Sequence, residues 1–174
     1  MIQDLFYSLS DYSARCHRQQ LMPHAPVTYL VHVVNVAMEV MEANHALNNF
    51  DIDFALKVAF LHDVLEDTET SFETLQSDFG QQIADGVLAL TRNPELPRNV
   101  QILDSLERIL RQPYEVWVVK MADRIVNLHN RPGFRTREQA ELYKVESVQI
   151  MESLSIANLY LAQRLSKMIS SFKA

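Results

Sequence analysis

The sequence is poor in the residues that mark turn-rich β proteins, disulfide-bonded secreted proteins and membrane proteins. Three glycines in 174 residues are too few for the many tight turns of a β protein. The single cysteine, Cys16, cannot form an internal disulfide, which is typical of proteins in a reducing cytosol. The N-terminus lacks a basic region followed by a long apolar stretch, and no apolar run approaches the length of a membrane span. We therefore expect a cytoplasmic protein with no membrane partner.

Positive charge is also scarce, and this limits the expected partners. The formal net charge is −6, which argues against a nucleic-acid partner and leaves room for a local basic pocket only. Hydrophobic residues make up 48% of the chain and charged residues 22%, as in ordinary globular proteins. We find no internal repeat and no boundary between two units. The length and composition therefore predict a single domain over residues 1–174 with a sizeable core.

Helical periodicity of apolar residues runs through the chain, and no segment alternates convincingly as a strand does. We predict helices at about residues 5–20, 29–45, 70–78, 81–90, 99–110 and 137–168, together with one that carries the apolar run 54–61 and one that starts at Pro113. Thr70 is the expected N-cap of its helix, Gly80 separates two helices, and residues 130–133 are expected to form a turn. The predicted fold class is therefore an all-α helical bundle.

The most informative stretch runs from Phe60 to Thr68. It places one histidine, two aspartates and one glutamate directly behind an apolar run. With 3.6 residues per helical turn, His62 and Glu66 share one face of the predicted helix. Asp63 and Asp67 share the neighbouring face. Burying four ionisable groups at the end of an apolar helix is costly unless a metal ion or a substrate uses them. The stretch therefore indicates a site of chemistry.

Two further ionisable residues, His32 and Asp123, lie in apolar stretches of other predicted helices. A lone histidine such as His32 is more often a satisfied core residue than a ligand, so it needs partners. The set that supplies two imidazoles and two carboxylates is His32, His62, Asp63 and Asp123. Such donors suit Mn²⁺, Fe²⁺, Co²⁺ or Zn²⁺ better than Ca²⁺. A six-coordinate ion would retain positions for water and a phosphate oxygen, which predicts a phosphohydrolase centre.

Two longer strings make the pattern more specific. They are His-Asp-Val-Leu-Glu-Asp-Thr over residues 62–68 and Lys-Met-Ala-Asp-Arg-Ile-Val-Asn over residues 120–127. Smaller matches lie at Ala14-Arg15, His17, Tyr29, His32 and Phe79-Gly80. Over about residues 5–165 the chain resembles the HD-domain phosphohydrolases and, more narrowly, the alarmone hydrolases of the RelA/SpoT type and their small stand-alone relatives. The resemblance implies an HD-domain helical bundle that removes pyrophosphate from the ribose 3′ position of (p)ppGpp, giving GDP or GTP.

The resemblance also implies roles for residues in the two strings. The metal ligands, which usually hold Mn²⁺ in this family, would be His32, His62, Asp63 and Asp123. Glu66 and Asp67 match the acidic pair that orients or deprotonates the attacking water. Both residues lie near the predicted end of a helix, where the helix dipole and the neighbouring negative charge favour the protonated form of a carboxyl. Our hypothesis is that Glu66 handles the proton.

The expected substrate contacts are less complete than the metal site. Asn127 matches a residue that contacts the ribose, and Arg15 matches a basic residue of the nucleotide pocket. Further candidates for binding phosphate are His17, Arg18 and Arg92. Relatives often carry a lysine where this chain has Cys16, and the loop over residues 21–26 has no lysine or arginine. These departures leave the identity of the nucleotide open.

Two alternatives therefore stay beside the alarmone hydrolase. One is an HD-domain hydrolase of another nucleotide phosphate, such as NADPH or a nucleoside monophosphate. The other is a non-catalytic, nucleotide-binding helical module, against which the complete ligand set argues. In each case the partner is a small-molecule nucleotide, and a homo-oligomer remains open. Arg124 can either reach a substrate phosphate or pair with Glu66 or another carboxylate, and pairing is the expected role.

Overall fold

The computed structural model describes residues 1–23, 25–130, 133 and 136–172. Its elements are α1 (Ile2–Cys16), α2 (Leu30–Leu47), α3 (Ile52–Leu61), α4 (Val64–Asp67), α5 (Phe72–Phe79), α6 (Gln81–Leu90), α7 (Gln101–Ile109), α8 (Tyr114–His129), α9 (Arg137–Leu154), the 3₁₀ turn η1 (Ser155–Ala157) and α10 (Leu159–Ser171). Extended pairing within these residues is limited to one isolated bridge between Leu21 and Thr28. The all-α prediction is confirmed.

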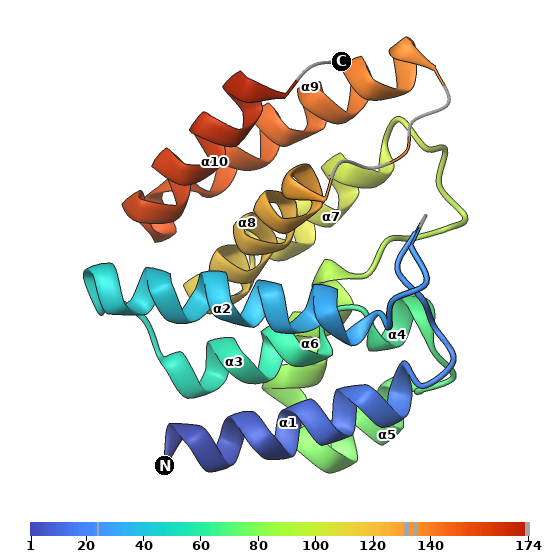
Figure 1. Cartoon of the computed structure of the whole chain (residues 1–174), viewed down its shortest axis with the longest axis vertical. Coiled ribbons are helices and arrows are strands. Elements are labelled where there is room, and N and C mark those ends of the chain that lie inside the picture. Colours follow the sequence, from blue (N-terminus) through green and yellow to red (C-terminus); the bar gives the residue numbers. More distant parts are fainter. Residues whose placement is uncertain (24, 131–132, 134–135, 173–174) are drawn as a thin grey trace.

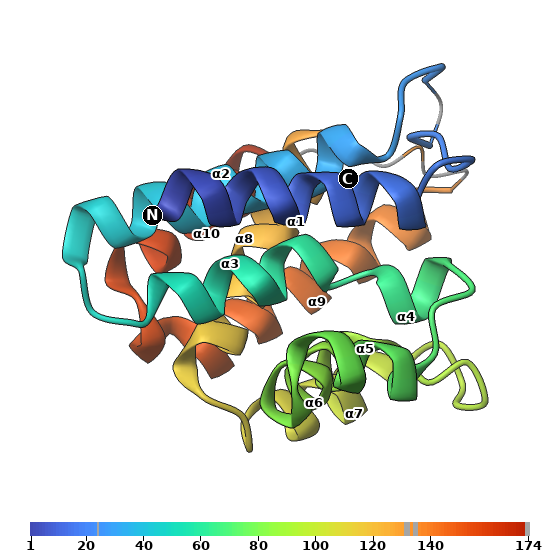
Figure 2. The ribbon, with the colours of Figure 1, turned by 90° about the horizontal axis from the view of Figure 1, so that it is seen from below.

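Helix α8 lies at the centre of the bundle (Figure 1). It packs against α2 and α3 on one side and against α9 and α10 on the other, and α6 also contacts it. Most of its residues are buried, including Val119, Met121 and Ile125. Figure 2 shows α1 running alongside α3 and α2. A helix with most of its residues buried needs neighbours on several sides, so α8 holds the other helices to a common core.

One glycine sets how closely two of these helices approach. A Cβ atom at Gly86 of α6 would lie 2.9 Å from a methyl group of Val116 on α8. Real Cβ contacts are essentially never that short, so this position lets α6 pack directly on α8. Among the described residues no helix is both long enough and apolar enough to cross a membrane.

The prediction of one long helix over residues 137–168 is wrong, because the structure has two helices there. The chain turns at η1, and α9 and α10 pack side by side (Figure 1). Asn158 fixes the turn because its side chain accepts a hydrogen bond from the Leu161 amide at 3.0 Å and donates one to Asn49 at 3.0 Å. The Asn49 side chain in turn donates to the Ala157 carbonyl at 2.9 Å. A contact from a distant part of the chain therefore interrupts a periodicity that continues through the sequence.

The helix expected to carry the charged stretch is also interrupted. Helix α3 ends at Leu61 and α4 begins at Val64, so His62 and Asp63 lie in the turn between them. In a continuous helix neighbouring residues point in directions about 100° apart. The break between α3 and α4 instead brings the side chains of His62 and Asp63 together, with His62 Nε2 and Asp63 Oδ2 2.9 Å apart.

Smaller differences concern helix ends. Helix α1 ends at Cys16 rather than at residue 20, and the N-cap of α5 is Ser71, whose hydroxyl accepts from the Thr74 amide. The expected cap, Thr70, instead bonds to Thr68. Gly80 separates α5 from α6 as predicted, with a positive φ of 86° that favours glycine. The predicted turn at residues 130–133 includes residues 131 and 132, which lie outside the described residues.

Candidate metal centre and active site

Two histidines and two aspartates converge where α2, the end of α3 and α8 meet. The Nε2 atoms of His32 and His62 lie 3.2 Å apart. The Asp63 Oδ2 atom is 2.9 Å from the Nε2 atom of His62 and 3.6 Å from that of His32. The Asp123 Oδ1 atom is 3.4 Å from the Nε2 atom of His32 and 3.8 Å from that of His62. The structure thus brings together the four residues that the sequence predicts as ligands.

The spacing of three of these donor atoms fits one divalent cation, with Asp63 beside them. Ligand atoms that each lie about 2.1 Å from a metal ion are about 3.0–3.5 Å from one another in tetrahedral or octahedral geometry. Three of the four side chains, those of His32, His62 and Asp123, place their donor atoms within 4.8 Å of one another. Both imidazoles are buried. Two nitrogens and two oxygens in such a pocket suit a transition-metal ion.

Hydrogen bonds behind the ligand atoms hold them in place. The Nδ1–H group of His62 donates to the Ala59 carbonyl at 2.7 Å, which leaves Nε2 for a cation. The Tyr29 hydroxyl donates to Asp63 Oδ2 at 2.5 Å. The Asn127 amide donates to Asp123 Oδ1 at 2.5 Å. These hydrogen bonds therefore fix the orientations of His62, Asp63 and Asp123.

The charges of the cluster are mutually balanced. Burial lowers the pKa of His62, but the Asp63 carboxylate opposes this effect and raises the pKa to about 9. Burial favours neutral Asp63, but the charge and hydrogen bond of His62 hold the pKa of that carboxyl well below its usual range. Burial likewise opposes ionisation of Asp123, whose pKa is held low by Lys120 and both histidines. The carboxylates stay ionised, so they are ready to act as ligands.

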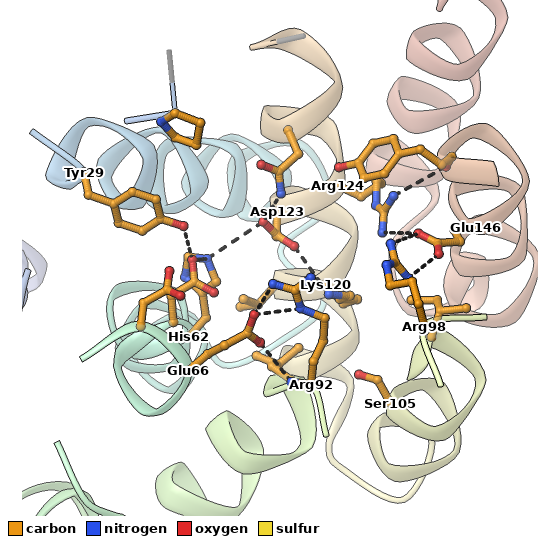
Figure 3. Close-up of a pocket in the computed structure, with 18 residues that line it drawn as sticks. Tyr29, His62, Glu66, Arg92, Arg98, Ser105, Lys120, Asp123, Arg124 and Glu146 are labelled. Carbon is orange, nitrogen blue, oxygen red and sulfur yellow. Dashed lines mark hydrogen bonds and ion pairs between the residues drawn. The ribbon is translucent and has the colours of Figure 1, made fainter. Parts of the chain in front are cut away.

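Helix α4 carries Glu66 and Asp67, which line the same cavity as His62, Asp63 and Asp123. Figure 3 shows Glu66 near His62. The Arg92 side chain donates through Nε to Glu66 Oε1 at 2.7 Å and through Nη2 to the same atom. The Arg92 backbone amide donates to Glu66 Oε2 at 2.9 Å. Asp67 accepts a 2.9 Å bond from the Gln20 amide. Partial burial raises the pKa of Asp67, and the bond from Gln20 opposes that rise.

A cavity of about 380 Å³ opens next to the cluster. Its lining combines carboxylates with cations and polar side chains, namely Asp63, Glu66, Asp67, Asp123, Glu146, Arg92, Arg98, Lys120, Arg124, Asn127, Tyr29 and Tyr143. Figure 3 shows His62 at one end, Arg98 and Arg124 beside Glu146 at the other, and Asp123 and Arg92 between them. Arg92 and Asn127, both predicted as substrate contacts, therefore lie in the same cavity as the metal cluster.

Glu146 closes the end of the cavity remote from the histidines. Its carboxylate is 2% exposed and accepts two bonds from Arg98, at 2.6 and 3.1 Å. Arg124 approaches the same carboxylate at 3.7 Å and stacks over the Tyr143 ring, with its guanidinium carbon 4.0 Å from the ring centre. Arg124 thus pairs with a carboxylate as expected, and the carboxylate is Glu146 rather than Glu66.

The basic residues predicted near the end of α1 lie elsewhere. Arg15 and Arg18 line a second cavity of about 540 Å³, and Asp67 lines both cavities. His17 is 1% exposed and packs against the Tyr29 ring, with ring centres 5.1 Å apart. Burial lowers its pKa, which favours the neutral ring. The structure thus places His17 behind the site.

Several residues of the site were not identified from the sequence. Glu146 and Arg98 pair across 48 positions of the chain, and Gln20 and Asp67 across 47. Local periodicity contains no signal for such pairs. The position of Tyr29 in the site could have been inferred from the sequence. It precedes His32 by three residues, so its side chain lies about one helical turn from that of His32.

The comparisons with known proteins agree with this arrangement. A family model described as HD domain matches residues 10–158. A guanosine-3′,5′-bis(diphosphate) 3′-pyrophosphohydrolase MESH1 of Drosophila melanogaster is 28% identical, over 93% of this chain and 91% of that protein. The Homo sapiens protein of the same name is 29% identical, over 90% of this chain and 88% of that protein.

Solved structures show the same fold. One, described as "A metazoan ortholog of SpoT hydrolyzes ppGpp and plays a role in starvation responses", is 27% identical with a TM-score of 0.80, covering 95% of this chain and 94% of that chain. A Listeria monocytogenes EGD-e protein, lmo0812, has a TM-score of 0.67 at 19% identity, over 87% of this chain and 97% of its own, and supports the fold alone. The chain belongs to the HD domain family.

Proposed function

We propose that this protein is a metal-dependent phosphohydrolase that removes the 3′-pyrophosphate of (p)ppGpp, consuming one water and releasing GDP or GTP. The observation that carries the proposal is the convergence of His32, His62, Asp63 and Asp123 beside the acidic pair of α4, in a cavity that also holds arginines. Relatives named for this activity align with nearly the whole chain, which supports the choice of substrate.

We propose Mn²⁺ as the ion and His32, His62, Asp63 and Asp123 as its ligands. Mixed nitrogen and oxygen donors suit this ion. The donor atoms of His32, His62 and Asp123 lie within 4.8 Å of one another, and Asp63 Oδ2 lies 2.9 and 3.6 Å from the two imidazole nitrogens, which supports this set. A bound divalent cation supplies Lewis acidity toward a phosphate oxygen and lowers the pKa of a water molecule. Tyr29 and Asn127 orient the two carboxylates through the hydrogen bonds described above.

The acidic pair of α4 handles the proton of the attacking water. Glu66 is held by Arg92 and Asp67 by Gln20, so both carboxylates have defined positions at the cavity wall. Oxygen atoms in such positions can accept a proton from water next to the metal cluster. We propose Glu66 as the acceptor and Asp67 as its partner in orienting the water.

The arginine and lysine side chains of the cavity beside the metal cluster, and those of the second cavity, would bind the nucleotide. Arg98, Arg124 and Lys120 provide charge for phosphates, and the Asn127 amide oxygen can accept from a ribose hydroxyl. Arg15 and Arg18 can contact the part of the nucleotide remote from the bond that breaks, because their cavity shares Asp67 with the first. We further propose that residues 1–174 form one HD domain acting on a free nucleotide in the cytoplasm.

A second substrate class is a nucleotide with a single phosphate at the reacting position, such as NADPH or a nucleoside monophosphate. The observation that favours it is the pairing of the cavity cations: Arg92 with Glu66, Lys120 with Asp123, and Arg98 with Glu146. Cations that are already paired have less charge to offer a substrate with two diphosphates.

Product analysis tests both classes. The protein would be incubated with Mn²⁺ in H₂¹⁸O and ppGpp, NADPH or a nucleoside monophosphate, and the products identified by mass spectrometry. We expect GDP and labelled pyrophosphate, because attack at phosphorus puts the water oxygen on the released pyrophosphate, while the ribose 3′ oxygen leaves with GDP. Asp63→Ala should abolish turnover, whereas Asp53→Asn, an exposed aspartate of α3, should not. If only NADPH or a nucleoside monophosphate is hydrolysed, the second substrate class is the correct one. Metal binding without any turnover would refute the proposal.

A further inference from the structure

A short chain of side chains connects the end of α1 to the carboxylate of Asp67. The Nδ1 atom of His17 lies 2.6 Å from Oε1 of Gln20, and Nε2 of Gln20 donates to Oδ2 of Asp67 at 2.9 Å. Within the described residues no other side chain donates to this carboxylate. Asp67 is otherwise open to solvent at the wall shared by the two cavities. Gln20 is therefore what limits the rotation of the Asp67 side chain.

The chemistry of the three groups fixes the direction of each bond. An ionised carboxylate only accepts hydrogen bonds, so the amide nitrogen of Gln20 must face Asp67. The amide oxygen then faces His17, whose Nδ1 must carry the hydrogen. The other ring nitrogen of His17 is buried with no partner, which is consistent with a neutral ring protonated at Nδ1. His17 thus prevents the amide of Gln20 from flipping.

The backbone around Gln20 is also fixed. Its amide donates to the His17 carbonyl at 2.9 Å, and its carbonyl accepts from the Tyr29 amide at 3.0 Å. The Tyr29 ring packs against His17, and its hydroxyl donates to Asp63. The same few residues thus support one proposed metal ligand and one proposed catalytic carboxylate.

We propose that Gln20 is a positioning residue for the reaction, holding Asp67 toward the attacking water, and that His17 orients the Gln20 amide. This inference rests on the proposed function, because it assigns the positioned carboxylate a part in hydrolysis. Gln20 itself touches neither the metal cluster nor the reacting atoms.

Kinetics of matched variants test the inference. Gln20→Ala should lower kcat by about tenfold with little change in KM, because a misplaced catalytic group weakens the reaction more than substrate binding. His17→Leu should act in the same direction, whereas His17→Asn, which keeps an N–H donor near the position of Nδ1, should retain most of the activity. The control is Gln3→Ala, which removes an exposed side-chain amide of α1 that lines neither cavity. Unchanged kcat in Gln20→Ala, or a loss explained by reduced metal content, would overturn the inference.

A double variant and a spectroscopic measurement separate positioning from general damage. In an Asp67→Ala background, Gln20→Ala should cause no further loss of kcat, and a second tenfold loss would show that Gln20 acts elsewhere. In ¹H–¹⁵N spectra, the side-chain amide signals that disappear in Gln20→Ala should shift in Asp67→Ala. If the wild type hydrolyses no nucleotide, the proposed function fails, while these signals still decide whether Gln20 holds Asp67. Signals that do not shift would refute the contact itself.

Discussion

Arg92 offers the sharpest test of how the acidic pair works. It follows α6 and binds Glu66 through its backbone amide, its Nε atom and its Nη2 atom. Arg92→Ala removes the side-chain contacts and leaves the 2.9 Å backbone bond. Glu66 would then keep one anchor on Oε2 and lose the two on Oε1. The carboxylate should therefore remain near the cavity with its orientation relaxed.

The expected magnitudes differ between stability and catalysis. The Arg92 side chain is 55% exposed, so solvent screens the ion pair and its loss should cost less than about 1 kcal/mol in the free energy of unfolding. A misdirected catalytic carboxylate can reduce turnover by about 10- to 100-fold, which corresponds to about 1.4–2.7 kcal/mol in the activation free energy. We expect kcat to fall by that factor while KM changes little.

The assay is steady-state hydrolysis of ppGpp, combined with urea unfolding. Arg92→Lys should restore part of kcat, because it keeps the charge without the two-pronged geometry of the guanidinium. The control is Arg111→Ala, which breaks a surface pair with Glu107 whose side chains are 72% and 70% exposed. Adding Arg92→Ala to Glu66→Gln should cause little further loss, and Glu66→Gln should itself alter the pH–rate profile. A raised KM at unchanged kcat would refute this reasoning and make Arg92 a phosphate ligand.

Two further predictions concern the metal cluster and the buried end of the cavity. Mn²⁺ at 100 times its Kd should stabilise the protein by about 2.7 kcal/mol, and so raise Tm by about 5–10 °C in calorimetry. The shift should vanish in Asp63→Ala. It should also shrink as the pH falls below about 9, because the Asp63 carboxylate raises the pKa of His62 to about 9 and a protonated imidazole cannot bind the ion. An equal shift in Asp63→Ala would exclude these ligands. Glu146→Ala should lower the unfolding free energy by about 3 kcal/mol in urea, because Arg124 would be left buried and unpaired. A loss below about 1 kcal/mol would show that water or another group solvates Arg124.

The sequence contained the information for most helices and for the metal cluster, and for identifiable reasons. Apolar periodicity locates α2, α6 and α8, and Gly80 marks a helix boundary because few other residues adopt its positive φ. The four proposed ligands were recognisable because ionisable side chains at apolar helix positions are unusual. The sequence predicts that these side chains come together, but the distances between them depend on how α2, α3 and α8 pack.

What the periodicity could not reveal depends on contacts between distant segments. The turn between α9 and α10 is fixed by Asn158 together with Asn49. Asn158 is a common type of N-cap residue, but one such residue is too weak a local signal to interrupt the apolar periodicity of residues 137–168. The partner of Arg124 was left open because Glu66 and Glu146 are equally plausible carboxylates until the helices are placed. The sequence predicted that His17 binds substrate phosphate, because it lies in a basic cluster. Such a cluster gives no sign that the His17 side chain is buried.

The interruption between α3 and α4 explains how one stretch of sequence serves two purposes. His62 and Asp63 lie in the turn, where both reach the cluster with His32 and Asp123, and these positions rest on the core helices α2, α3 and α8. The acidic pair lies on α4, a helix of four residues, too short to be stable by itself.

The positions of that pair are therefore set from outside α4. Arg92, from the segment after α6, holds Glu66, and Gln20, from the segment after α1, holds Asp67. In the proposed mechanism, metal binding and proton transfer consequently depend on different parts of the fold. Substitutions in the core of α8 should affect both properties together, whereas substitutions of Arg92 or Gln20 should reduce turnover in a protein that still binds its metal ion.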